Sequence, residues 1–272
     1  MKSIVSILLL CFLAPLCGYA KADTPLQIVL PPFEREFQPY GVYFYKVLSL
    51  ALQKTVEVDG PFEIKVTSKF FSIERLVADL KRGDGINVMW TTINHQRETE
   101  LLPIRVSLLK ELNNYRLLLV RTEDQAKFEK VMDLAGLKKF SAGLGAQWPE
   151  VSIFKKNGLS VVTSTTYPTL FKMLAAERFD YFPRGLYEVW DEANLNKDLG
   201  IVIDNNIMLY YPAPFYFFVA RKDVELANRI ERGLKLAIAD GSFDELLNSV
   251  PSFRRGLEEQ ETSKRKIIFL TD

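Results

Sequence analysis

Short apolar runs of strand length alternate with longer amphipathic stretches along most of this chain, and this alternation constrains the fold more than any other feature. Leu26–Leu30 ends at two prolines, and residues 42–54 then place apolar side chains on one helical face. Ser72 can cap a following helix, and Gly83 can end it. Strands that alternate with helices are typical of α/β proteins. We therefore predict the α/β class, with mixed, mostly parallel sheets.

The second half of the chain repeats this order, and it suggests how the chain divides. A helix is predicted over 128–137, and two long apolar strands, 115–120 and 215–220, bracket a segment that can form a lobe of its own. The last predicted helices then return to the first lobe. The expected division is a leader at 1–22, a first lobe from 23–120 plus 213–272, and a second lobe from 121–212.

The N-terminus has the features of a secretory signal peptide. Lys2 precedes an apolar stretch over residues 4–16, and small residues follow at Ala20 and Ala22. The apolar stretch is too short to span a bilayer as a helix, which argues against the alternative of a retained anchor. We predict cleavage after Ala22, with cleavage after Ala20 as the alternative, and export to the periplasm.

Cleavage at Ala22 would remove both cysteines of the chain, Cys11 and Cys17, so no disulfide or thiolate site is expected in the exported protein. The chain carries 35 basic and 34 acidic side chains, a balance that argues against a nucleic-acid partner. No later apolar run reaches the length of a membrane span. We expect a freely diffusing monomer.

Four segments together resemble the periplasmic solute-binding proteins of the amino-acid type, which are family 3 proteins with the type II two-lobed fold. Each segment is a weak signal, but their order and spacing cover nearly all of the exported chain. The resemblance implies two lobes joined by two crossover strands, which close over a small ligand by hinge bending. The segments are 31–33 with 40–42, 90–97, 142–145 and 213–247.

The resemblance also implies a site for an anionic group. In that family an arginine of the loop at 90–97 pairs with the ligand carboxylate, and a threonine five residues earlier hydrogen-bonds to it; these positions are Arg97 and Thr92 here. A guanidinium offers a planar fork of donors that matches a carboxylate. The competing interpretation is a surface arginine paired with Glu98 or Glu100.

The sequence departs from the family pattern after Asp180. Amino-acid binders place an acidic residue about five positions later to hold the ligand's ammonium group, whereas this chain has Arg184 and Gly185 there. An arginine cannot hold an ammonium group. Two arginines facing one cleft suggest a dicarboxylate, or another ligand with two anionic or strongly accepting groups. The alternative is an internal ion pair of Arg184 with Glu188, one helical turn further on.

Aromatic residues are frequent near these loops, and family members stack one of them on the ligand. Most of them must nevertheless belong to the core, because an aromatic stripe is more often packing than a site. The candidates for the ligand site are Phe33, Trp90 and Trp148.

The sequence contains few of the residues that catalytic triads and metal sites usually require. His95 is the one histidine, so a catalytic triad or a histidine-rich metal site is not expected, and neither is a cofactor. We therefore predict a non-enzymatic protein that captures a small polar, anionic ligand for an ABC-type importer in the membrane. Two alternatives stay open: a sensor subunit that signals to a membrane receptor, and a dehydratase-like enzyme with Glu188 as acid or base.

Overall fold

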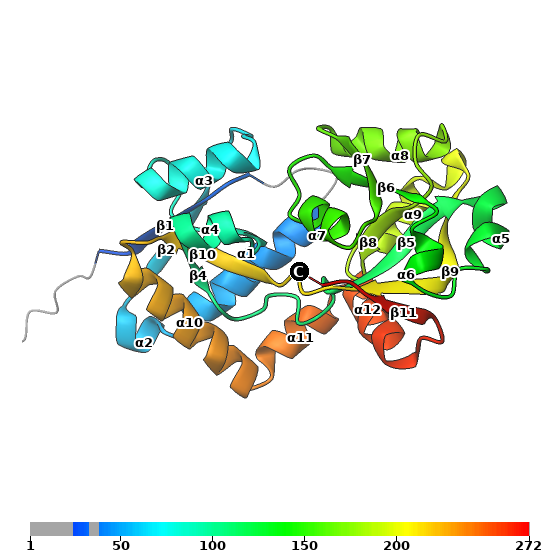
Figure 1. Ribbon diagram of the computed structural model, residues 1–272. Coiled ribbons are helices and arrows are strands. Elements are labelled where there is room, and N and C mark those ends of the chain that lie inside the picture. The colour runs from blue at the N-terminus through cyan, green and yellow to red at the C-terminus, as the bar shows by residue number, and fades with distance from the viewer. Residues whose placement is uncertain (1–23, 33–37, 272) are drawn as a thin grey trace, which may run out of the picture.

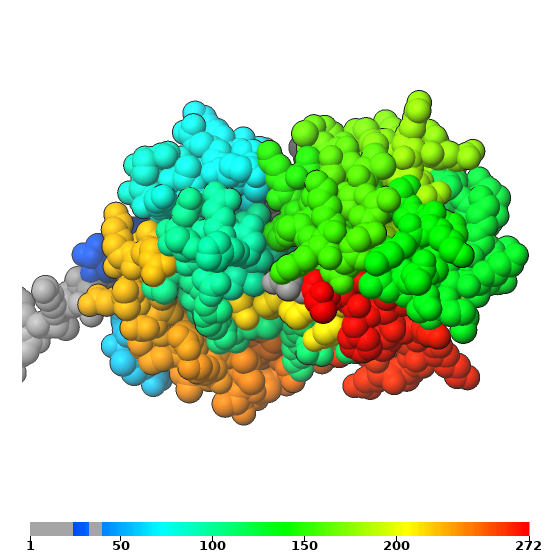
Figure 2. All heavy atoms as spheres, in the orientation of Figure 1, coloured from blue at the N-terminus to red at the C-terminus, as the bar shows by residue number. Residues whose placement is uncertain are grey.

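The structure of the protein, a computed structural model, describes residues 24–32 and 38–271. The predicted leader and Phe33 lie outside these residues. Two halves, each built from strands and covering helices, lie side by side (Figure 1). Figure 2 shows them meeting along a seam across the front of the molecule. In the described ranges no helix combines the length and the apolar character needed to cross a membrane.

The first half contains two small sheets. β1 (Leu26–Leu30) pairs in parallel with β2 (Phe62–Val66), and β10 (Phe215–Ala220) lies antiparallel between β3 (Met89–Thr92) and β4 (Leu101–Ile104). Helices α1 and α10 pack against each other beside these sheets. The helices of this half are α1 (Gln38–Gln53), α2 (Val56–Asp59), α3 (Ile73–Arg82), α4 (His95–Glu100), α10 (Val224–Ala239) and α11 (Ser242–Asn248).

The second half is built on a sheet with the strand order β11–β9–β5–β8. β5 lies antiparallel to both of its neighbours, whereas β11 runs parallel to β9. A parallel pair, β6 and β7, is joined to this half by a bridge between Ala142 and Tyr181. The strands are β5 (Tyr115–Arg121), β6 (Ser141–Gly145), β7 (Ser160–Ser164), β8 (Phe182–Gly185), β9 (Ile201–Tyr210) and β11 (Lys266–Phe269). The helices are α5 (Gln125–Phe128), α6 (Leu134–Leu137), α7 (Glu150–Lys156), α8 (Tyr167–Ala175), α9 (Val189–Leu195) and α12 (Pro251–Thr262).

The described chain crosses between the halves three times, after β4, after β9 and after α11. Two buried asparagines tie the first two crossings together. Asn113 donates through its amide nitrogen to the carbonyl of Ala213 (2.5 Å), and the Asn114 carbonyl accepts from the N–H of Tyr211 (3.0 Å). The side-chain oxygen of Asn114 also accepts from the N–H of Ala213 (2.8 Å). The two connecting segments therefore form one joint.

Local signals predicted α3 correctly but did not predict the break after Phe128. The Ser72 hydroxyl accepts from the N–H of Arg75 at the start of α3, and Gly83 ends the helix with a left-handed φ of 79°. The helix predicted over 128–137 is wrong, because α5 ends at Phe128 and α6 is a separate short turn. The Asn206 amide nitrogen donates to the carbonyls of Phe128 (3.0 Å) and Val131 (3.1 Å), which a continuous helix would have used internally.

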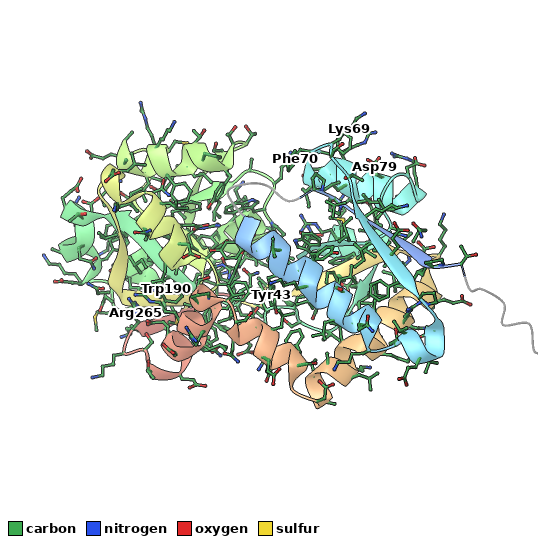
Figure 3. All side chains as sticks on the ribbon, turned by 180° about the vertical axis from the view of Figure 1, so that it is seen from behind. Tyr43, Lys69, Phe70, Asp79, Trp190 and Arg265 are labelled. Atoms are coloured by element: carbon green, nitrogen blue, oxygen red, sulfur yellow. The ribbon has the colours of Figure 1, made fainter. Side chains whose placement is uncertain are left out.

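The end of the chain lies in the second half. We expected all of 213–272 to return to the first lobe, but β11 pairs with β9, and Ile268 is buried in the core of the second half. Figure 3 shows Arg265 and Trp190 together in this half. The expected boundary at residue 120 also falls inside β5, which belongs to the sheet of the second half.

Candidate functional site

A cavity of about 350 Å³ lies where the two halves meet, within the size range of small-molecule sites. Residues of both halves line it, and hydrogen bonds cross its edges. The Tyr40 hydroxyl of α1 donates to Asp191 of α9 (2.9 Å), and the Gln147 amide, with its nitrogen turned toward the carboxylate, donates to Glu74 of α3 (2.6 Å). The aromatic lining residues are Tyr40, Phe44, Trp90, Trp148, Tyr187, Tyr211 and Phe215.

Thr92 and Arg97 lie together in the wall contributed by the first half. Thr92 ends β3, and the Asn94 side chain caps α4 by accepting from the N–H of Arg97 (2.8 Å). This turn directs the arginine back toward the strand. The Arg97 Nη1 donates to the carbonyl of Thr92 (2.7 Å) and to its hydroxyl (3.1 Å), and both residues line the cavity.

Arg97 is not the surface ion pair that the competing interpretation predicted. Its side chain is buried, while Glu98 pairs with Arg105 and Glu100 lies near Lys81 (3.9 Å). Within the described residues, no carboxylate lies within ion-pair distance of Arg97, and the hydrogen bonds of its guanidinium go to Thr92. Burial lowers the pKa of the Arg97 guanidinium, and the negative charges of Glu150 and Glu74 partly oppose this shift. A buried cation with donors to spare is suited to hold an anion.

Arg184 also lines the cavity, but its charge is already compensated. Its Nη2 lies 2.8 Å from Glu188 Oε2, as in the internal pair that the sequence allowed. It also bonds to Glu192, through Nε to Oε2 (2.6 Å) and through Nη2 to Oε1 (2.8 Å). The rings of Trp148 and Phe182 lie 5.0 and 4.7 Å from the guanidinium carbon. Arg184 therefore carries two carboxylate partners before any ligand arrives.

Glu192 is the titratable member of this buried cluster. It accepts a hydrogen bond from Tyr167 in addition to those from Arg184. Burial raises the pKa of Glu192 to about 7; the Arg184 charge opposes this shift, and the Glu188 charge adds to it. The cluster can therefore gain or lose one proton near neutral pH.

Arg116 is a third buried arginine at the cavity, and it was not among the residues predicted from the sequence. It lies on β5, with its Nη2 3.2 Å from Glu150 Oε1 and its guanidinium carbon 4.9 Å from the centre of the Tyr211 ring. The sequence feature that could have indicated Arg116 is its charge within the apolar run of residues 115–121, because a charged side chain in a buried strand needs a partner.

The predicted aromatic candidates that the structure describes both line the cavity. Trp90 and Trp148 are half-buried, and they come from opposite halves. Phe44 stacks on Trp90 (5.3 Å between ring centres) and on Phe215 (5.5 Å). Gly145 is required beside Trp148, because a Cβ there would lie 2.4 Å from the indole ring.

The other chemical candidates lie apart from this arrangement. His95, the one histidine of the chain, is exposed at the start of α4. The described ranges hold no group of three or more histidine, cysteine or acidic side chains spaced to bind a metal.

Comparisons with known proteins identify the fold. No protein-family model and no curated protein matches the sequence. An ancestral arginine-binding protein bound to glutamine matches with a TM-score of 0.63 and 15% identity, over 84% of this chain and 99% of the other. A histidine kinase sensor domain with similarity to periplasmic binding proteins matches at 0.60 and 16%, over 84% and 97%. The substrate-binding protein of an amino-acid ABC transporter matches at 0.57 and 14%, over 83% and 99%.

These identities support a shared fold and nothing finer. The chain has the two-lobed, type II α/β fold of the periplasmic binding proteins, and its structural likeness is to amino-acid-binding members of that group. The expected α/β class, the two-lobed type II fold and the mixed sheets are confirmed. The expectation that the sheets are mostly parallel is wrong, because β5 and β10 each lie antiparallel to both of their neighbours.

Proposed function

We propose that this protein is an extracytoplasmic solute-binding protein that captures a small, polar, anionic ligand between its two lobes and presents it to an ABC-type importer. The observation that carries the proposal is Arg97, a buried arginine in the cavity wall that bonds to Thr92 and has no carboxylate partner in the described chain. The ligand's carboxylate would supply that partner. The predicted leader supports a periplasmic location.

A sensor subunit that signals to a membrane receptor is the second candidate, and the likeness to a histidine kinase sensor domain favours it. Both roles use the same ligand site, so a neighbouring permease gene or receptor gene distinguishes them. The dehydratase-like alternative needs an acid or base that can reach the ligand. Glu188 is instead bonded to Arg184 and to the N–H of Gly185 (3.1 Å), which argues against it.

A thermal-shift screen of the exported protein tests the proposal. The panel holds amino acids, monocarboxylates, dicarboxylates, peptides, nucleosides and sugar acids. A ligand at 100 times its Kd stabilises the folded state by about 2.7 kcal/mol, a readily measured shift. Arg97→Ala should weaken binding of any carboxylate ligand by roughly 10- to 100-fold, because the charge-assisted bonds to the anion are lost.

Arg105→Ala is the matched control. It also removes one arginine of the first half, but this side chain is exposed and pairs with Glu98 away from the cavity. Its affinity should equal that of the unmodified protein. A ligand that binds Arg97→Ala as tightly as the unmodified protein would show that the anchor is misassigned.

A further inference from the structure

Among the described residues that line the cavity, one cation has no carboxylate paired with it. Arg116 is balanced by Glu150, and Arg184 is held by Glu188 and Glu192. Among the described residues, Arg97 is the lining cation that no carboxylate approaches within ion-pair distance. The cavity therefore offers a place for one negative charge, and that place is in the wall of the first half.

In the part of the chain that the structure describes, the carboxylates near the cavity are already bonded to other protein groups. Glu188 accepts from Arg184 and from the N–H of Gly185, and Glu192, which does not line the cavity, accepts from Arg184 and Tyr167. Asp191 accepts from Tyr40, and Glu150 faces Arg116. A ligand ammonium group would have to compete for a carboxylate that is already bonded, or it would be buried without a carboxylate partner. Both outcomes cost binding free energy.

A second ligand carboxylate is disfavoured for the same reason. Arg184 already has two acidic partners, 2.8 Å away at Glu188 and 2.6 Å away at Glu192. A further anion beside it would be repelled by both, and would have to displace one from a buried pair.

The remainder of the wall is largely aromatic. In the first half, Phe44 is stacked between Trp90 and Phe215. Tyr187, which follows β8 of the second half, meets Phe215 edge to face (6.0 Å). Trp148 lies on the wall of the second half. Flat apolar surfaces on both sides of a cavity of about 350 Å³ favour a flat, apolar ligand body of modest size.

We propose that the ligand is an aromatic monocarboxylate without an ammonium group: its one carboxylate bonds to Arg97 and Thr92, and its ring lies between the Phe44–Trp90–Phe215 stack and Trp148. This inference rests on the proposed function, because it uses the same cavity and the same anchor. It replaces the dicarboxylate that the sequence suggested, since Arg184 is not available to a second carboxylate. Recognition then comes from one charge and a shaped aromatic wall.

Four compounds that share a phenyl ring and a short chain test the inference by titration calorimetry at pH 7. 3-Phenylpropanoate carries one carboxylate. Phenylalanine adds an ammonium group, phenylsuccinate adds a second carboxylate, and 3-phenylpropanamide has no charge. We expect 3-phenylpropanoate to bind at least tenfold more tightly than each of the others, and Arg97→Ala to remove at least tenfold of its affinity. Arg105→Ala should leave that affinity unchanged.

The outcomes separate this inference from the proposed function. Equal or tighter binding of phenylalanine or phenylsuccinate, still dependent on Arg97, overturns the inference and keeps the anion-binding function. Equal binding of the uncharged amide, or binding of 3-phenylpropanoate that Arg97→Ala does not weaken, overturns both. No binding by any of the four overturns the inference, and the broad ligand panel with the Arg97 and Arg105 variants then decides the function separately.

Discussion

At the scale of single residues, three buried arginines share one cavity and differ in what surrounds them. Arg97 and Arg184 are almost equally buried, at 6% and 5% exposure, yet the first is bonded to a threonine and the second to two glutamates. Residue type therefore does not decide which arginine meets a ligand. The neighbouring groups decide it, because the charge of a guanidinium that is paired with carboxylates is already compensated.

The Glu192 carboxyl group should make stability depend on pH near neutrality. Its pKa is about 7 in the folded state, above its ordinary value of 4.5, so the folded protein binds this proton more tightly than the unfolded chain does. The free energy of unfolding should therefore fall as pH rises from about 4.5 to about 7, by on the order of 1–3 kcal/mol, and then level off. Denaturant unfolding at pH 5.5, 6.5 and 8 measures this dependence.

Glu192→Gln should flatten that pH dependence, because the substitution keeps the shape of the side chain and removes the titrating group. Glu98→Gln is the control, since Glu98 is paired with Arg105 away from the cluster. An unchanged slope in Glu192→Gln would assign the titration to another group.

The residues of the site were only partly predictable from the sequence. The anchor at Arg97 and Thr92 was proposed from the resemblance of residues 90–97 to a loop of the solute-binding family, and the structure places the two residues in hydrogen-bond contact. Glu188 was foreseen as a partner of Arg184 at a helical spacing. Glu192 and Arg116 were not, since their partners depend on how α9 and β5 pack rather than on local spacing.

At the scale of elements, local chemistry sets the ends of helices, while contacts from distant segments decide where a predicted helix breaks. Ser72 and Gly83 give α3 its bounds from neighbouring residues alone. The break after Phe128 depends on Asn206, which is 78 residues away in sequence, so no local pattern could have predicted it. The sequence thus predicted that these segments are helical, but it did not predict the break between α5 and α6.

The packing of α10 on α1 gives a prediction at the same scale. Gly233 lies against the backbone of α1, and a Cβ there would come within 1.9 Å of the carbonyl oxygen of Ala51. Gly233→Ala should therefore lower the free energy of unfolding by about 1–3 kcal/mol or more, because the helices must move apart. Gly136→Ala in α6 is the matched control: its nearest neighbour would be 3.4 Å away, and its effect should stay within about 0.5 kcal/mol. Denaturant unfolding compares the two variants.

At the scale of the whole molecule, the chain passes repeatedly between the halves, and its division is not a simple insertion of one lobe into the other. The sequence predicted the two long strands at 115–120 and 215–220. It did not predict that α12 and β11 would complete the second half, because parallel pairing of β11 with β9 joins segments far apart in the chain.

Figure 3 shows Tyr43 near the middle of the molecule, with Lys69 and Phe70 at the rim of the first half.

β1 lies in the first half and β11 in the second, so labels attached near the two strands can report movement of one half relative to the other. A donor fluorophore attached ahead of β1 and an acceptor attached after β11 would each move with a different half (Figure 1). Energy transfer between them should change when a ligand closes the lobes, and should not change in Arg97→Ala at the same ligand concentration. Constant transfer at a saturating ligand concentration would mean that capture takes place without lobe motion. The doubly labelled protein would thus report ligand binding in solution without a labelled ligand.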